Sequence, residues 1–344
     1  MFAYSSYIQS AEVLKNVSVQ FNRYFSIFIF LFGMIGNILN CFVLSQPNLR
    51  LNPCAYLFLI SSLTNMISIT FGLSTRILSG WNMDFTDSNT LMCKFRAFVM
   101  LTSQTTSFWL IAFATIDRWF SSCCQYQRRQ MSSLKNAQRG TIIIIILSIL
   151  LYSQILYCYE ANITSTPLKC YGKSAECRLL TDIIYALITI LFPLLIMCIF
   201  GLMTISNIRQ TYYVILFKRT NTGSDNENKR TLVLTNRQRE RWKKIDRYLL
   251  HVLLVQTILL TVFTLPQVIE KIYTTLAANP RKSSLHNTID KFIYNFVLLL
   301  TYVASGMPFY IYTLSGGSIF RNALRNLFRS MFSFTTNTSV RTTE

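Results

Sequence analysis

Apolar residues gather in seven long stretches, and shorter polar segments separate these stretches along the chain. Each stretch holds about 20 residues or more, the length that an α-helix needs to cross the hydrocarbon core of a bilayer, which is about 30 Å thick. The fourth is the clearest, with an unbroken run of isoleucine over 142–146. The pattern predicts an all-α membrane protein, a seven-transmembrane helix bundle with helices over 23–45, 55–78, 92–120, 140–159, 181–207, 246–272 and 288–314.

The third stretch is the most polar of the seven. An uninterrupted polar run, 102–107, lies in its middle. A polar helix is stable in lipid only when other helices surround it. We therefore expect the third helix to lie at the centre of the bundle.

Beyond the seventh stretch, apolar residues recur at helical spacing among arginines. Such a pattern is typical of an amphipathic helix that lies on a membrane surface. The predicted organisation is an extracellular N-terminus over 1–22, the seven-transmembrane domain over 23–314, an amphipathic eighth helix over 315–333 and a cytoplasmic tail over 334–344.

Lysine and arginine are distributed unevenly among the connecting segments. They concentrate between the third and fourth stretches, between the fifth and sixth, and after the seventh, whereas the alternate connections are balanced or acidic. Cytoplasmic loops of membrane proteins carry this excess of basic residues. We expect a multi-pass protein of the plasma membrane with its N-terminus outside. The sequons at Asn16 and Asn162 then face outside, where they are candidates for glycosylation.

Composition agrees with lipid as the surrounding medium. Charged residues make up 14% of the chain, against about 25% in soluble domains. The net charge of +19 would alone suggest nucleic acid, but the basic residues form no single face or arm, so membrane lipid is the expected partner and nucleic acid is not. Signatures of catalytic loops, paired carboxylates and metal-ligand clusters are missing, so the sequence predicts no enzyme, no cofactor and no metal site.

Distinct chemistry marks the two ends of the third helix. Cys93 begins the stretch and Asp117-Arg118-Trp119 ends it, and Arg118 follows Cys93 by 118 − 93 = 25 residues. At about 1.5 Å per helical residue this separation is roughly 37 Å, enough to cross the bilayer. One helix therefore carries a cysteine to one membrane surface and an acid–base pair to the other.

These residues and several others resemble motifs of the rhodopsin-like (class A) G protein-coupled receptors. The resemblance covers about 23–333, and the 25-residue spacing from Cys93 to Arg118 is the usual one in that family. The sequence Asp117-Arg118-Trp119 stands where the family has Asp-Arg-Tyr. The other matching residues are Gly36-Asn37 in the first helix, Pro193 and Pro266 in the fifth and sixth, and Phe320-Arg321 at the start of the eighth.

The chain also departs from the family pattern. Asn65 replaces the usual aspartate of the second helix, and Thr264 replaces the usual tryptophan of the sixth. In the seventh helix, Pro308 and Tyr312 belong to a degenerate form of the Asn-Pro-x-x-Tyr motif. The first departure places the family's sodium site in doubt, and the second leaves the usual ligand-sensing switch undefined.

The resemblance implies a disulfide between Cys93 and the second outer loop. Cys170 and Cys177 are the candidate partners, whereas Cys158 lies too near the fourth helix. We favour Cys170, because the 193 − 170 = 23 residues from there to Pro193 leave room for the chain to enter the fifth helix.

A switch is expected at the cytoplasmic ends of the third and sixth helices. Asp246 precedes Pro266 by 20 residues, or roughly 30 Å along a helix, which places it beside Arg118. A charge pair there would hold the two helices together, although an ordinary exposed charge is the alternative. The expected switch residues are Asp117, Arg118, Asp246, Asn37, Asn65, Pro266, Pro308 and Tyr312.

The ligand pocket is expected to open outward among the second, third, sixth and seventh helices. Met100 and Gln104 lie one and two turns inward from Cys93. Because no acidic residue occupies the Met100 position, where amine receptors of the family carry an aspartate, an amine ligand is not expected. Mixed charge at the mouth suits a peptide, as in a neuropeptide receptor, and the further candidate residues are Arg76, Gln267, Glu270 and Tyr294.

The resemblance further implies an extracellular ligand, a heterotrimeric G protein and, through the hydroxyl-rich tail, arrestin as partners. The alternatives are a chemosensory receptor of the same fold for environmental small molecules, a receptor-like protein that no longer couples, and a transporter or channel. Few ionisable residues at membrane depth and no repeat symmetry argue against the last.

Overall fold

The protein is described here by a computed structural model that places residues 2–47, 49–81, 83–123, 125–163, 168–221, 251–273, 284–314, 320–327 and 329. Two of the expectations lie outside the described residues, namely Asp246 and the tail over 334–344. The predicted eighth helix is described in part, as a helix over 320–327.

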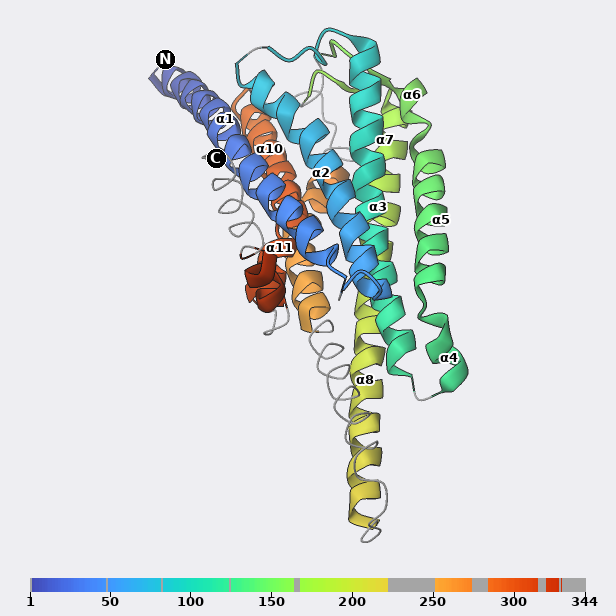
Figure 1. The fold of residues 1–344 in the computed structure, drawn as a ribbon. Helices are drawn as coiled ribbons and strands as arrows, with labels where there is room; N and C mark the ends of the chain where they lie inside the picture. The colour runs from blue at the N-terminus through green and yellow to red at the C-terminus, as the bar shows by residue number, and fades with distance from the viewer. Residues whose placement is uncertain are drawn as a thin grey trace, which may run out of the picture.

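The architecture is a bundle of long helices with one short hairpin at one end (Figure 1). Among the described residues, six helices are long and apolar enough to cross a membrane, and a bent pair gives a seventh crossing when its two helices are taken as one span. The first part of the bundle consists of α1 (Phe2–Leu44), α2 (Pro53–Ser79), α3 (Thr90–Ser122), α4 (Tyr126–Met131), α5 (Leu134–Tyr152) and α6 (Ile155–Cys158). The second part consists of the strands β1 (Tyr159–Glu160) and β2 (Tyr171–Gly172), α7 (Ala175–Ile184), the π-helical turn η1 (Tyr185–Leu191), α8 (Phe192–Asn221), the helix His251–Tyr273, α10 (Ser284–Gly306) and α11 (Pro308–Leu314).

Three predicted helices begin at least six residues earlier in the structure than in the sequence analysis. The fourth starts at Leu134, where the Ser133 hydroxyl caps it, and not at residue 140, and it is interrupted between Tyr152 and Ile155. The first starts at Phe2 and not at residue 23, because no glycine or proline precedes Gly33 and nothing interrupts the helix. The fifth starts at Ala175 and not at residue 181, because the Ser174 hydroxyl caps it by accepting a hydrogen bond from the Cys177 amide. The widened turn η1 ends just before Pro193, where a regular helix would bring the proline ring against a carbonyl.

The seventh crossing is broken, whereas the sequence analysis expected one helix over 288–314. Its two helices, α10 and α11, meet at an angle of 52°. The break falls at Met307, directly before Pro308, which cannot donate a backbone hydrogen bond and restricts the residue before it.

Helix α3 lies inside the bundle, as its polarity predicted. In its most apolar 18-residue segment, 72% of the residues are buried, a larger share than in any other membrane-spanning helix found among the described residues. Its polar run over 102–107 is buried and bonds to neighbouring helices, with Ser107 paired to Ser61 of α2 at 2.9 Å and Thr105 to Thr189 of η1 at 2.7 Å. These contacts satisfy hydroxyls that lipid could not.

Close approach of α1 and α10 depends on a pair of glycines. A Cβ on Gly306 would lie 2.9 Å from the Gly33 Cα, which is closer than real Cβ atoms come to backbone. We expect Gly306→Ala to lower the free energy of unfolding by about 1–3 kcal/mol, since the helices must separate. Thermal unfolding of the purified protein measures this loss.

Gly201→Ala is the matched control, because a Cβ there would meet only the Leu254 side chain, at 3.5 Å. Equal melting temperatures for the Gly306 and Gly201 variants would contradict the assigned packing.

Candidate functional site

Disulfides close one end of the bundle, which we call the disulfide-bonded end. Cys93, in the first turn of α3, is bonded to Cys170, with Cα atoms 5.6 Å apart. Cys158 is bonded to Cys177, a second bridge that the sequence analysis did not predict, because it considered Cys177 only as a partner for Cys93. The two bridges hold the hairpin of β1 and β2, in which Tyr159 pairs with Gly172, against α3 and α7.

A cavity lies beside this hairpin. Its empty volume is about 550 Å³, including the part that is open to solvent. Of the six residues that the sequence analysis assigned to a ligand pocket, five line the cavity and Glu270 does not. The lining residues are Arg76, Arg96, Ala97, Met100, Leu101, Gln104, Tyr159, Leu168, Cys170, Tyr171, Tyr185, Gln267, Lys271, Tyr294, Leu298 and Tyr302.

Polar contacts fix the residues at the inner side of the cavity. The Gln104 side-chain amide donates to the Tyr185 hydroxyl at 3.2 Å, which joins α3 to η1. The Tyr302 hydroxyl lies 2.9 Å from the Met100 sulfur and joins α10 to α3. These contacts give the cavity a wall built from several helices, so a bound molecule would contact α3, η1 and α10 together.

A buried ion pair crosses the bundle next to the cavity. The Lys271 ammonium lies 2.5 Å from an Asp182 carboxylate oxygen, and their side chains are 6% and 5% exposed. The Tyr171 hydroxyl lies 3.3 and 3.4 Å from the two Asp182 oxygens, and Lys271 lies 4.9 Å from the centre of the Tyr185 ring. The pair therefore ties the helix His251–Tyr273 to α7 and to the hairpin.

Sequence reasoning missed this pair, although a signal was present. Lys271 and Asp182 lie in or next to stretches otherwise rich in apolar residues. An ionisable residue at such a position is by default a candidate for function and needs a partner. Arg96 was missed as well, although it follows Cys93 by less than one helical turn.

The hairpin contributes tyrosines whose hydroxyls remain protonated. Burial raises the pKa of Tyr159 and of Tyr171 above the usual range, with the positive charge of Lys271 acting in the opposite direction. Protonated hydroxyls can donate hydrogen bonds, and the Tyr171 hydroxyl accordingly donates to the Asp182 carboxylate.

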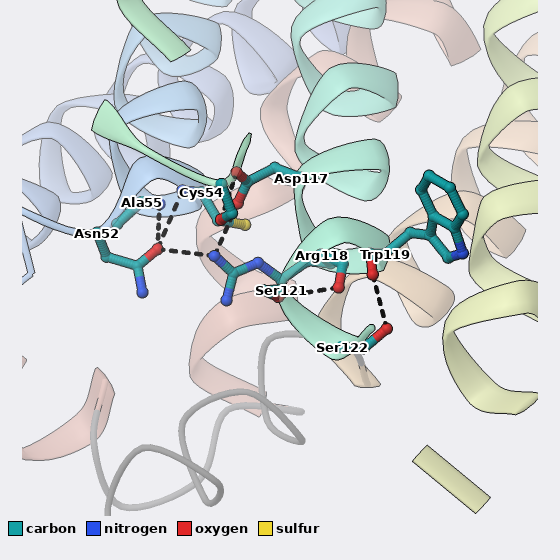
Figure 2. A network of polar contacts seen from close by, with 9 residues as sticks. Asn52, Cys54, Ala55, Asp117, Arg118, Trp119, Ser121 and Ser122 are labelled. Atoms are coloured by element: carbon teal, nitrogen blue, oxygen red, sulfur yellow. Dashed lines mark hydrogen bonds and ion pairs between the residues drawn. The ribbon is translucent and has the colours of Figure 1, made fainter. Parts of the chain in front are cut away.

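At the opposite end of α3, which we call the Arg118 end, a buried polar network surrounds the Asp117-Arg118 pair (Figure 2). Arg118 Nη2 donates to Asp117 Oδ2 at 2.8 Å and to Asn52 Oδ1 at 3.2 Å. Asn52 Oδ1 also caps α2 by accepting from the Cys54 amide at 3.0 Å, and Ser132 donates to Asp117 Oδ1 at 2.7 Å. The network joins α3 to the start of α2 and to the segment between α4 and α5.

Trp119 points away from this network, toward α8 (Figure 2). Its ring packs edge-on against Phe200, with centroids 5.2 Å apart, and the Arg128 guanidinium lies 5.8 Å from the ring centre. The tryptophan that replaces the family's tyrosine therefore packs α3 against α8.

The other expected switch residues lie between helices. The Tyr312 hydroxyl donates to Gln256 Oε1 at 3.1 Å, which joins α11 to the helix His251–Tyr273. Asn37 donates to the Ser305 carbonyl at 3.1 Å, which joins α1 to α10, and Asn65 is buried in α2. Pro308 is the first residue of α11 and lies at the bend, whereas Pro266 lies within the helix His251–Tyr273.

Comparison with known proteins agrees with this arrangement. The family model described as 7 transmembrane receptor (rhodopsin family) matches residues 36–312, well over half of the chain. Among curated proteins, none matches the sequence closely enough to count as a relative. The matched segment begins at Gly36 and ends at Tyr312, which are the motif positions of the first and seventh helices. The chain therefore belongs to the rhodopsin family of seven-transmembrane G protein-coupled receptors, which are multi-pass membrane receptors and not enzymes.

Proposed function

We propose that this receptor binds a peptide-like extracellular ligand in the cavity at the disulfide-bonded end and activates a heterotrimeric G protein at the Arg118 end. The observation that carries the proposal is that one buried helix, α3, supplies both sites. Met100 lines the cavity, and Arg118 follows it by 118 − 100 = 18 residues, or roughly 27 Å. A ligand that prefers one of two helix arrangements can therefore shift the other site.

The cavity chemistry supports a peptide over an amine. Three basic side chains line it, those of Arg76, Arg96 and Lys271, and the lining residues include no aspartate or glutamate. A cationic amine would find no carboxylate there. The aromatic and polar walls of the cavity suit the end of a peptide or an organic acid.

The orientation that we propose places the N-terminus outside and the Arg118 end in the cytoplasm of a plasma-membrane receptor. The excess of lysine and arginine between α3 and α5 and after α8 supports it. Exposed Asn16 and Asn162 would then be accessible to glycosylation, and the helix over 320–327 would lie on lipid.

The hydrogen bonds of Arg118 would hold the receptor in its inactive arrangement. Arg118 is buried and bonded to Asp117 and Asn52. A G protein helix enters a cytoplasmic groove in this family, so Arg118 would have to change partners when the groove opens. A contribution from Asp246, and recruitment of arrestin by the hydroxyl-rich tail, remain part of the proposal.

We expect Asp117→Asn to raise ligand-independent G protein activation by about tenfold, because losing one hydrogen bond to a charged group changes a two-state equilibrium by roughly that factor. Nucleotide exchange on a co-expressed Gα subunit, in membranes with matched receptor density, measures the effect. Arg118→Ala should remove the increase when combined with Asp117→Asn.

Lys291→Gln is the control, because this exposed residue lies in α10, outside the network. The same exchange rate in the wild type, Asp117→Asn and the double variant would speak against a switch at this site.

A further inference from the structure

Arg76 is buried in the cavity wall with part of its guanidinium unbonded. The residue is 8% exposed, and Nη1 donates to Asn295 Oδ1 at 2.6 Å. The other terminal nitrogen, Nη2, is buried and makes no hydrogen bond with the described residues. A buried cation without full hydrogen bonding is costly, so such a group signals a missing partner.

Arg96 lines the same cavity from α3. Its Nε donates to the Phe71 carbonyl at 3.3 Å, and Nη1 donates to the Thr86 hydroxyl at 3.3 Å. Thr86 in turn donates to Asp84 at 2.7 Å, so the nearest carboxylate is one hydroxyl removed from Arg96. The backbone of α2 and the segment before α3 therefore hold this guanidinium in place at the edge of the cavity.

The described part of the chain supplies no direct counter-ion for either arginine. The ion pairs found there are Asp117–Arg118, Asp87–Lys169 and Asp182–Lys271. In the sequence, the undescribed residues that separate α2 from α3, β1 from β2 and the helix His251–Tyr273 from α10, namely 82, 164–167 and 274–283, include no aspartate or glutamate. Lys271, the third cation of the cavity, already has Asp182.

We propose that Arg76 and Arg96 form a carboxylate-binding subsite for the ligand, a proposal that rests on the cavity being the ligand pocket. The planar guanidinium matches a carboxylate with two parallel hydrogen bonds, and the strength of such a bond rises away from water. Gln267 is 1% exposed, and its Oε1 makes no hydrogen bond with the described residues, so it can accept one from a ligand N–H.

These groups define the ligand class. A carboxylate lies against Arg76 and Arg96, an N–H group lies near Gln267, and an apolar body lies against Met100 and Leu298. A peptide with a free carboxylate and an acidic organic molecule of similar size share this chemistry.

Benzoate and its neutral isostere benzamide test the subsite without knowledge of the natural ligand. The full-length receptor, in nanodiscs and at constant ionic strength, is melted in the presence of each compound. Benzoate should raise the melting temperature saturably and benzamide should not. Arg76→Gln and Arg96→Gln should each weaken the apparent benzoate affinity by about tenfold or more, whereas Lys291→Gln should leave it unchanged.

Arg76→Lys separates a folding defect from loss of the subsite, because it keeps the charge and loses the planar pair of donors. It should fold and still bind benzoate more weakly than the wild type. Equal shifts for benzoate and benzamide, or unchanged benzoate affinity in both glutamine variants, would overturn the proposal. Inorganic phosphate that stabilises more than benzoate would overturn it in favour of a phosphate ligand.

This binding measurement is independent of G protein activation. Failure of the benzoate test together with a raised exchange rate for Asp117→Asn would remove the carboxylate subsite and leave the proposed function in place. A positive benzoate test together with an unchanged exchange rate for Asp117→Asn would keep the carboxylate-binding site and remove the proposed signalling role.

Discussion

Lys271→Met is expected to lower the free energy of unfolding by about 3–5 kcal/mol, because Asp182 would stay buried after losing the ammonium group beside it. The pair is 2.5 Å apart, with neither side chain more than 6% exposed. Asp182→Asn should cost a similar amount for the converse reason. The double variant should recover most of the loss, since no buried charge is left without its counter-ion.

A double-mutant cycle on thermal unfolding of the purified receptor measures the coupling. The Lys169–Asp87 pair at the same end of the bundle is the matched control, because its side chains are 64% and 23% exposed at a distance of 3.2 Å. An exposed pair contributes about 0–1 kcal/mol. Single-variant losses that simply add in the double variant at Lys271 and Asp182 would show that the ion pair does not join these helices.

The second large effect is expected from the disulfides. Replacing Cys93 and Cys170 with serine should lower the free energy of unfolding by about 2–5 kcal/mol. The bridge joins residues 77 apart in sequence, whereas Cys158–Cys177 joins residues 19 apart. Since loop-closure entropy rises with the logarithm of loop length, losing the first bridge should cost about 1 kcal/mol more than losing the second.

Melting temperatures of the two paired serine variants, compared with the wild type, test this order. A variant lacking Cys158 and Cys177 that melts below the variant lacking Cys93 and Cys170 would contradict it. The comparison also isolates the contribution of the bridge that sequence reasoning did not predict.

The sequence predicted the number and the order of the membrane-spanning helices, but not the starts of the first, fourth and fifth or the break in the seventh. Helix α3 was predictable, because its length, its polar run and the interval from Cys93 to Arg118 all follow from spacing along the chain. A signal for the bend at Met307 was present, since Gly306 and Pro308 flank it and a proline interrupts backbone hydrogen bonding.

Contacts between helices were not predictable in the same way, because they depend on how each helix is rotated about its axis. Asp182 and Lys271 are 89 residues apart, and their pairing needs the rotation of two helices. Glu270 and Lys271 are neighbours in sequence but point about 100° apart around the helix. Lys271 therefore lines the cavity, whereas Glu270 does not. Asn52 caps α2 in the structure, and its bond to Arg118 depends on where α3 ends.

Occupation of the cavity should activate a G protein at the far end of α3. The most direct measurement is G protein dissociation in cells that express the receptor with each class of Gα subunit, during exposure to a library of peptides, organic acids and amines. We expect dose-dependent dissociation with a carboxylate-bearing member, and we expect this response to be lost in the Arg118→Ala variant at equal surface expression. Dissociation of no class of G protein by any carboxylate-bearing member that raises the melting temperature of the purified receptor, or dissociation that persists in the Arg118→Ala variant, would contradict this link between the cavity and the G protein.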